Sequence, residues 1–335
     1  MFCGRRLTAL CLKNQRHICY RVSSNSKLLT NMETVNVFEA IKQAIPPLVE
    51  SKYKGQAGRI GVIGGSKEYT GAPYFAAISA LKVGCDLSHV FCTSEASQVI
   101  KSYSPELIVH PLLDEVDALD EFVNWLPRLH TLVVGPGLGR NSRILSVAKN
   151  IVMKARDEGK QLVIDADGLW LITTEPDIIS GYTSSVLTPN AMEFIRLYKK
   201  MIGVELQVSN ITPDHVKQLA MALGGVTINA KGRHDIISDG EKVLTCELEG
   251  SLRRCGGQGD LLSGSLGTFL YWTYKHGLEQ NQTEGHLLKA TLSAAFAACC
   301  LTRRCSYLAF EKKNRHMTTS DMIEEIPEAF KQLFS

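Results

Sequence analysis

Residues 253–263 read RRCGGQGDLLS and stand directly before a stretch whose spacing predicts a long helix over residues 260–275. Glycines let a backbone approach a phosphate closely, and the free N–H groups at a helix start point at such an anion. Arg253 and Arg254 add fixed positive charge. A phosphate ligand repels an aspartate. Asp260 is therefore the base for an attacking hydroxyl, the cap of the helix, or both.

The chain around this segment alternates between two periodicities. Short apolar runs predict strands over 59–64, 87–92, 106–109, 131–134, 161–164, 185–187 and 226–229. Helical spacing is found over 33–49, 72–83, 96–103, 119–126, 142–156, 191–198, 214–223 and 283–302. Asp239-Gly240 indicates a hairpin between 235–238 and 242–246. The alternation predicts a single α/β domain over 32–335, with a mainly parallel central sheet covered by helices on both faces.

Several polar or glycine-rich segments follow the predicted strands directly. They cover residues 64–73, 135–139, 165–168, 188–193 and 231–235. In an open parallel sheet, ligands bind outside the carboxyl ends of the strands. We therefore expect a site where these segments meet.

The glycine-rich and acidic segments each allow two interpretations. Gly135-Pro-Gly-Leu-Gly139 has G-x-G-x-G spacing, which matches a dinucleotide fingerprint only loosely, and a tight turn explains it equally well. Asp165 and Asp167 have the chemistry to organise Mg²⁺ around phosphates, or they cap the next helix.

The next two segments also allow two interpretations each. Asn190 and Glu193 stand one turn apart, where they would hold water or Mg²⁺ near a triphosphate, or form a capping box. Lys231 and Arg233 would grip phosphates or lie in a solvated loop. Trp170 is more typical of a core residue than of a platform on which a base stacks.

Composition and charge exclude several classes of protein. Hydrophobic residues make up 44% and charged residues 21%, as in globular proteins, and no apolar run reaches the length of a membrane span. The net charge of +3 is too small to indicate a nucleic-acid partner. The ten cysteines form no C-x-x-C pair, which indicates free thiols rather than zinc ligands.

The basic charge is concentrated at the amino terminus. Residues 1–32 hold six lysines and arginines, no acidic residue and several serines, a composition typical of a mitochondrial transit peptide. We therefore expect residues 1–31 to be a mitochondrial targeting segment. A second start at Met32 would give a cytosolic form.

Two motifs resemble the ribokinase-like superfamily. Gly257-Gln-Gly-Asp260 matches its G-x-G-D motif, which combines an anion hole with a catalytic aspartate, and Asn190-Ala-Met-Glu193 matches its N-x-x-E element. A larger ordered set narrows the resemblance to the family of eukaryotic ATP-dependent (S)-NAD(P)H-hydrate dehydratases, over about residues 45–335. That set is YTGAPYF at 69–75, GPGLGR at 135–140, DADGL at 165–169, LTPN at 187–190 with EF at 193–194, and CGGQGDLLSG at 255–264.

The resemblance implies a role for each matching position. It implies that Asp260 is catalytic and that the hydrated dinucleotide contacts Gly137, Asn190, Ala191, Met192, Glu193, Phe194, Ile195, Arg196 and Asp260. It implies that ATP contacts Lys231, Gly232, Arg233, His234, Asp235, Gly250, Ser251, Leu252, Arg253, Arg254, Cys255, Gly256, Gly257, Gln258 and Gly259. Mg²⁺ is the implied cofactor, without assigned ligands.

The implied reaction uses ATP to dehydrate the S form of hydrated NADH or NADPH, with release of ADP and phosphate. Epimerisation of the hydrate would belong to a separate protein. The alternatives are a ribokinase-like small-molecule kinase acting on a vitamin precursor or sugar, and a nucleotide-binding regulator without turnover. The sequence leaves open the preference for NADH or NADPH and whether the chain forms a homo-oligomer.

Overall fold

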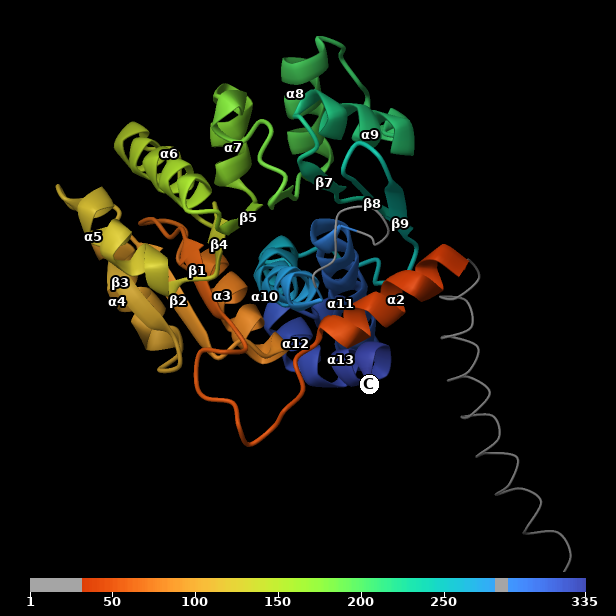
Figure 1. Ribbon diagram of the computed structural model, residues 1–335, viewed down its shortest axis with the longest axis horizontal. Coiled ribbons are helices and arrows are strands. Elements are labelled where there is room, and N and C mark those ends of the chain that lie inside the picture. Colours follow the sequence, from red (N-terminus) through yellow and green to blue (C-terminus); the bar gives the residue numbers. More distant parts are fainter. Residues whose placement is uncertain (1–31, 281–288) are drawn as a thin grey trace, which may run out of the picture.

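The computed structural model describes residues 32–280 and 289–335, with side chains from residue 37 onward (Figure 1). The expected targeting segment, residues 1–31, lies outside the described residues. Residues 283–288 of the helix predicted over 283–302 lie outside them as well. Within the described chain, no helix is long and apolar enough to span a membrane.

A nine-stranded sheet organises the described part of the chain, in the order β3-β2-β1-β4-β5-β6-β7-β8-β9. Its strands are β1 (Arg59–Ile63), β2 (Leu87–Cys92), β3 (Ile108–Pro111), β4 (Thr131–Val134), β5 (Gln161–Ile164), β6 (Ser185–Leu187), β7 (Thr227–Ala230), β8 (Asp235–Ser238) and β9 (Val243–Cys246). Neighbours from β3 to β7 pair parallel, and β8 pairs antiparallel with both β7 and β9. The predicted mainly parallel sheet and terminal hairpin are confirmed.

Helices cover both faces of the sheet (Figure 1). One face carries α2 (Met32–Ala44), α3 (Gly71–Val83), α4 (Ser94–Tyr103), α10 (Gln258–Glu279), α11 (Ala290–Lys313), α12 (Thr319–Glu324) and α13 (Ile326–Phe334). The other carries α5 (Ala118–Trp125), α6 (Ser142–Asp157), α7 (Asp167–Thr174), α8 (Ala191–Ile202) and α9 (Pro213–Ala222). The predicted two-sided covering is therefore confirmed.

The strands divide their side chains between two cores. Val62, Val90 and Val133 are fully buried in the core on the side of α10, while the neighbouring Ile63 and Phe91 are fully buried in the core on the side of α6. Successive strand residues point to opposite faces, and both faces here are covered. This explains why the strands read as continuous apolar runs.

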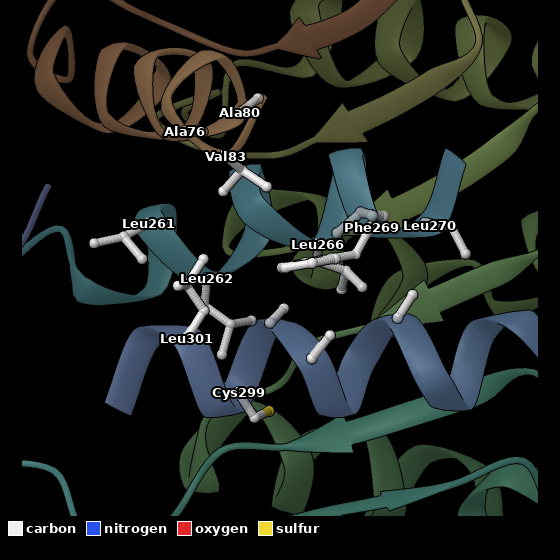
Figure 2. Close-up of a cluster of buried hydrophobic side chains, with 14 of the residues drawn as sticks. Ala76, Ala80, Val83, Leu261, Leu262, Leu266, Phe269, Leu270, Cys299 and Leu301 are labelled. Carbon is white, nitrogen blue, oxygen red and sulfur yellow. The ribbon is translucent and has the colours of Figure 1, made fainter. Parts of the chain in front are cut away.

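Close packing fixes the position of α10, which lies between α3 and α11 (Figure 2). Leu262, Leu266 and Phe269 bury their side chains in this cluster. A Cβ on Gly264 would lie 1.9 Å from the carbonyl oxygen of Ala76 on α3, so only glycine permits this approach. The amino end of α10 is thereby fixed relative to the sheet.

The two C-terminal helices were not predicted from the sequence. α12 has 6 residues and begins with a capping box between Thr318 and Asp321, and α13 carries a proline in its first turn. Helices this short are marginal in isolation, so tertiary packing supplies most of their stability. Both helices bury apolar residues in the core that contains α10.

Candidate active site

The predicted site lies at the carboxyl edge of the sheet, where backbone segments pack against one another. A Cβ on Gly135 would lie 1.8 Å from the carbonyl oxygen of Asp165, so the segments after β4 and β5 touch. Gly137 has a φ of +62°, and its carbonyl oxygen accepts bonds from Gly65 N at 3.1 Å and Ser66 Oγ at 3.0 Å. β1 and β4 flank the point where the strand order reverses, which is where open α/β sheets bind ligands.

A buried ion pair stands at the centre of this edge. The Asp165 side chain is 2% exposed, and its Oδ1 accepts bonds from Lys231 Nζ at 2.8 Å and Thr188 Oγ1 at 2.8 Å. These three residues follow β5, β7 and β6 respectively. The ion pair and the Thr188 hydrogen bond therefore join the ends of three neighbouring strands.

The start of α10 faces this ion pair. Gly257 is the N-cap of α10 with a φ of +94°, and Asp260 is the third helical residue. A Cβ on Gly259 would lie 3.3 Å from Lys231 Nζ and 3.9 Å from Asp165 Oδ2. The interpretation of Asp260 as the helix cap is therefore wrong, because Gly257 holds that position. Asp260 is left half-buried beside Lys231 and Asp165.

The charges of this cluster perturb one another. Burial, reinforced by the negative charge of Asp165, raises the pKa of Asp260 well above its ordinary value, and Lys231 only partly opposes this. Burial acts to lower the pKa of Lys231, but the carboxylates of Asp165, Glu193 and Asp260 raise it on balance. Lys231 is thus a firmly charged cation, and Asp260 binds protons more readily than an ordinary aspartate.

Asn190 and Glu193 form the capping box that the sequence allowed. Asn190 Oδ1 accepts bonds from the backbone N–H groups of Met192 and Glu193, both at 3.0 Å. Glu193 Oε2 accepts a bond from Asn190 N at 2.8 Å. Burial raises the pKa of Glu193, against the opposing charge of Lys231. The box fixes α8 so that Glu193 faces the charged cluster.

The remaining predicted substrate contacts on α8 differ in exposure. Met192 and Arg196 are exposed, and Ala191 and Ile195 are half-buried. Phe194 is fully buried in the core beneath the helix, so its side chain is unavailable to a ligand in this structure.

The predicted ATP segment at 231–235 forms a turn that side-chain hydrogen bonds hold in place. Arg233 and His234 are exposed at its tip. Asp235 is buried, and its two carboxylate oxygens accept bonds from Arg303 Nε at 2.6 Å and Gly232 N at 3.1 Å. Arg303 also donates to the carbonyl oxygen of Gly232 at 3.0 Å. The Asp235 side chain therefore holds the turn in place. The sequence analysis did not predict this role for Arg303, which lies on α11.

The predicted ATP segment at 250–259 leads into α10. Leu252, Arg253 and Arg254 are exposed, Cys255 is half-buried, and Gln258 Nε2 donates to the carbonyl oxygen of Arg253 at 3.2 Å. Thr319 Oγ1, on α12, donates to the carbonyl oxygen of Gly256 at 2.6 Å. Gly250 and Ser251 are half-buried, and Ser251 Oγ lies 2.7 Å from Ser306 Oγ on α11.

Replacing Gly257 by alanine tests whether the conformation of the segment before α10 matters for ATP. An added Cβ would lie 2.8 Å from Phe75 Cδ2 and 2.9 Å from Thr319 Oγ1, at a φ of +94°. Such strain costs about 1–3 kcal/mol. We expect kcat/KM for ATP to fall about tenfold or more. Steady-state kinetics at varied ATP measures this, with Gly277→Ala, near the opposite end of α10, as the control. Equal ATP kinetics in both variants would contradict the expectation.

The acidic residues of this edge do not form a metal cage. Asp165 is paired with Lys231, and Asp167 Oδ1 lies 3.1 Å from Arg140 Nε. Among the described residues, no three His, Cys, Asp or Glu side chains are grouped to hold an ion. The interpretation of Asp165 and Asp167 as residues that organise Mg²⁺ around phosphates therefore stays a prediction.

The prediction that Trp170 is a core residue is wrong. It is 37% exposed, and the guanidinium carbon of Arg140 lies 4.3 Å from the centre of its ring. Arg140, Trp170, Glu193 and Arg196 line a shallow hollow. The sequence placed Trp170 next to the DADGL motif but gave no sign of its exposure.

Comparison with known proteins decides the family. The family model described as NAD(P)H-hydrate dehydratase matches residues 60–328, most of the chain and the whole of the charged cluster. The chain belongs to the NAD(P)H-hydrate dehydratase family. The ATP-dependent (S)-NAD(P)H-hydrate dehydratase of Danio rerio is 56% identical over 302 residues, which are 89% of this chain and 89% of that protein. The Homo sapiens dehydratase of the same name is 55% identical over 301 residues, covering 89% of this chain and 85% of that protein.

Solved structures confirm the fold of this dehydratase-family chain. A ribokinase-like superfamily protein from Enterococcus faecalis matches with a TM-score of 0.71 at 20% identity, over 89% of this chain and 95% of that one. An ADP/ATP-dependent NAD(P)H-hydrate dehydratase from Bacillus subtilis, co-crystallised with ATP and Mg²⁺, has a TM-score of 0.64 at 20% identity. That match covers 88% of this chain and 97% of the bacterial one. The predicted ribokinase-like architecture is confirmed.

Proposed function

We propose that this chain uses ATP to dehydrate the S form of hydrated NADH or NADPH, with release of ADP and phosphate. The family membership and the two dehydratases at 55–56% identity support this activity. The observation that carries the catalytic assignment is the position of Asp260, in the first turn of α10 and beside Lys231. An acid–base group and a fixed cation thus meet at a helix start that suits a phosphate.

The chemistry follows from the poor leaving ability of hydroxide. Asp260 accepts the proton of the ring hydroxyl while that oxygen attacks the γ-phosphorus of ATP and the bond to ADP breaks. The hydroxyl is now a phosphate ester. The lone pair of the ring nitrogen expels phosphate, and loss of a proton from the adjacent ring carbon restores the dihydronicotinamide. ATP and the hydrate become ADP, phosphate and NAD(P)H.

Lys231 and the α10 backbone stabilise charge during the transfer. The N–H groups at the start of α10 lack helical partners, and we assign to them the stabilisation of the transferring group. Lys231 adds a cation that Asp165 holds at 2.8 Å. We assign the ATP phosphates to this helix start and to the exposed Arg233, Arg253 and Arg254. The hydrated ring lies on the side of Gly137 and Glu193.

We include Mg²⁺ in the proposal as a companion of ATP. The nearby carboxylates of Asp165 and Asp167 already face cations, so the donor set fits a metal held mainly by phosphates and water. When bound, Mg²⁺ neutralises phosphate charge.

The decisive experiment incubates the protein with ATP, Mg²⁺ and hydrated NADH. NADH absorbance and free phosphate should rise together, because both products leave in one turnover. A ribokinase-like small-molecule kinase, the second candidate supported by the fold, would form ADP and a stable phosphorylated product without NADH. Supply of the S form from the R form is assigned to a separate epimerase.

We further propose that residues 1–31 direct mitochondrial import and contribute nothing to catalysis. Their basic, acid-free composition supports this. A chain that starts at Met32 should keep its dehydratase activity and lose mitochondrial localisation. Fluorescence microscopy of tagged long and short forms, with activity assays of both, measures this. Mitochondrial localisation of the short form would contradict the proposal.

A further inference from the structure

The hollow beside the charged cluster is built from three elements. Arg140 follows β4, Trp170 lies on α7, and Glu193 and Arg196 lie on α8. Together with Leu169 they line a shallow depression that is open to solvent. An exposed indole next to two arginines presents a flat apolar surface and positive charge in one place.

The arginine and the indole are held in position by their neighbours. Asp167 Oδ1 accepts a bond from Arg140 Nε at 3.1 Å, and Asp167 Oδ2 accepts one from Gly139 N at 3.0 Å. The Arg140 guanidinium packs over the Trp170 ring at 4.3 Å, within the range of a cation–π contact. Arg196 Nε donates to the carbonyl oxygen of Met192 at 3.1 Å. Each bond uses the Nε atom, so the terminal amino groups can meet an anion.

The hollow and the charged cluster share one residue, Glu193. Glu193 lines the hollow and interacts electrostatically with Lys231, which lies at the start of α10 beside Asp260. A substrate with its reacting ring at Asp260 therefore passes Glu193 before it reaches Trp170. The segments assigned to ATP, residues 231–235 and 250–259, follow β7 and β9, farther along the sheet than the hollow between the ends of β4 and β6.

We propose that this hollow binds the adenylate half of the hydrated dinucleotide, with the base packed on Trp170 and Arg140 and a phosphate bound by Arg140 and Arg196. The inference rests on the proposed dehydratase function. A flat base, a ribose and a phosphate match the indole surface and the guanidinium groups. Trp170 and Arg140 thereby become binding residues for the part of the substrate that does not react.

The test compares Trp170→Ala with the unchanged protein on two substrates. Hydrated NADH carries the adenylate half, and hydrated reduced nicotinamide mononucleotide lacks it. Base stacking on an aromatic residue predicts that kcat/KM for hydrated NADH falls about 10–100-fold. The mononucleotide hydrate should keep its kcat/KM within about twofold, because the lost surface never touches it. Trp170→Phe should recover most of the loss.

Tyr53→Ala provides the control, since Tyr53 is 73% exposed and lies before β1, away from the carboxyl edge. Calorimetric titration with NADH itself adds a readout without turnover, and Trp170→Ala should bind NADH about 10–100-fold more weakly. Unchanged NADH binding, an equal loss on both hydrates, or a loss confined to the KM for ATP would each overturn the proposal. Failure of the unchanged protein to form NADH from the hydrate would instead reject the dehydratase function, and the NADH titration still decides the subsite.

Discussion

Replacing Asp260 by asparagine is expected to lower kcat by about 10²–10⁴-fold, the usual contribution of a positioned general base. Asparagine keeps the size of the side chain and removes the proton acceptor. Because Gly257 is the N-cap of α10, the substitution disturbs no cap. The affinity for ATP should be unchanged or slightly higher, since a negative charge near the γ-phosphate is lost.

The pKa of Asp260 gives this prediction a pH dependence and a control. Because burial and Asp165 raise that pKa, kcat/KM of the unchanged protein should fall as pH drops through the raised value. The folded protein holds the Asp260 proton more tightly than the unfolded chain does. The resulting stabilisation is present in acid and is lost as pH rises through the folded pKa. At neutral pH, Asp260→Asn should therefore melt at the same temperature or higher.

Kinetics, ATP titration and thermal melting of one preparation measure these effects together. A near-normal kcat in Asp260→Asn would reject the catalytic role. A sharply lowered melting temperature would contradict the assignment of Asp260 as a residue whose charge costs stability.

Replacing Lys231 by methionine is expected to cost both stability and activity. The Asp165 side chain is 2% exposed, and Lys231 Nζ lies 2.8 Å from its Oδ1. Breaking a buried ion pair by removing one partner costs about 3–5 kcal/mol, because the other charge stays buried and uncompensated. Turnover should also fall at least tenfold, because the phosphoryl group loses a fixed cation. Denaturant unfolding and steady-state kinetics measure the two losses.

The double variant Lys231→Met with Asp165→Asn separates the two effects. Asparagine removes the uncompensated charge and keeps an acceptor for Thr188 Oγ1, which lies 2.8 Å from Asp165 Oδ1. Most of the lost stability should return while the activity stays low. Recovery of activity together with stability would show that Lys231 serves only the fold.

The repeating pattern of the sequence predicted the strands and most helices, because burial on both faces of a parallel sheet leaves continuous apolar runs. β2, β4, β5 and β6 lie where the sequence predicted them. The short helices α12 and α13 were missed, since they depend on packing against the core that contains α10. Because α12 was not predicted, the sequence also missed a contact of the site: Thr319 on α12 donates a hydrogen bond to the segment before α10.

The sequence by itself determined the fold class, the family and the identity of the chemical groups. Glycine spacing, one aspartate and the order of the motifs are local properties that need no third dimension. Only the tertiary structure decided which groups meet. It paired Lys231 with Asp165 across separate strands, gave Asp260 a place beside them rather than at the cap, and left Trp170 exposed under Arg140. Burial and charge pairing depend on distances between segments remote in the chain, and residue order does not encode those distances directly.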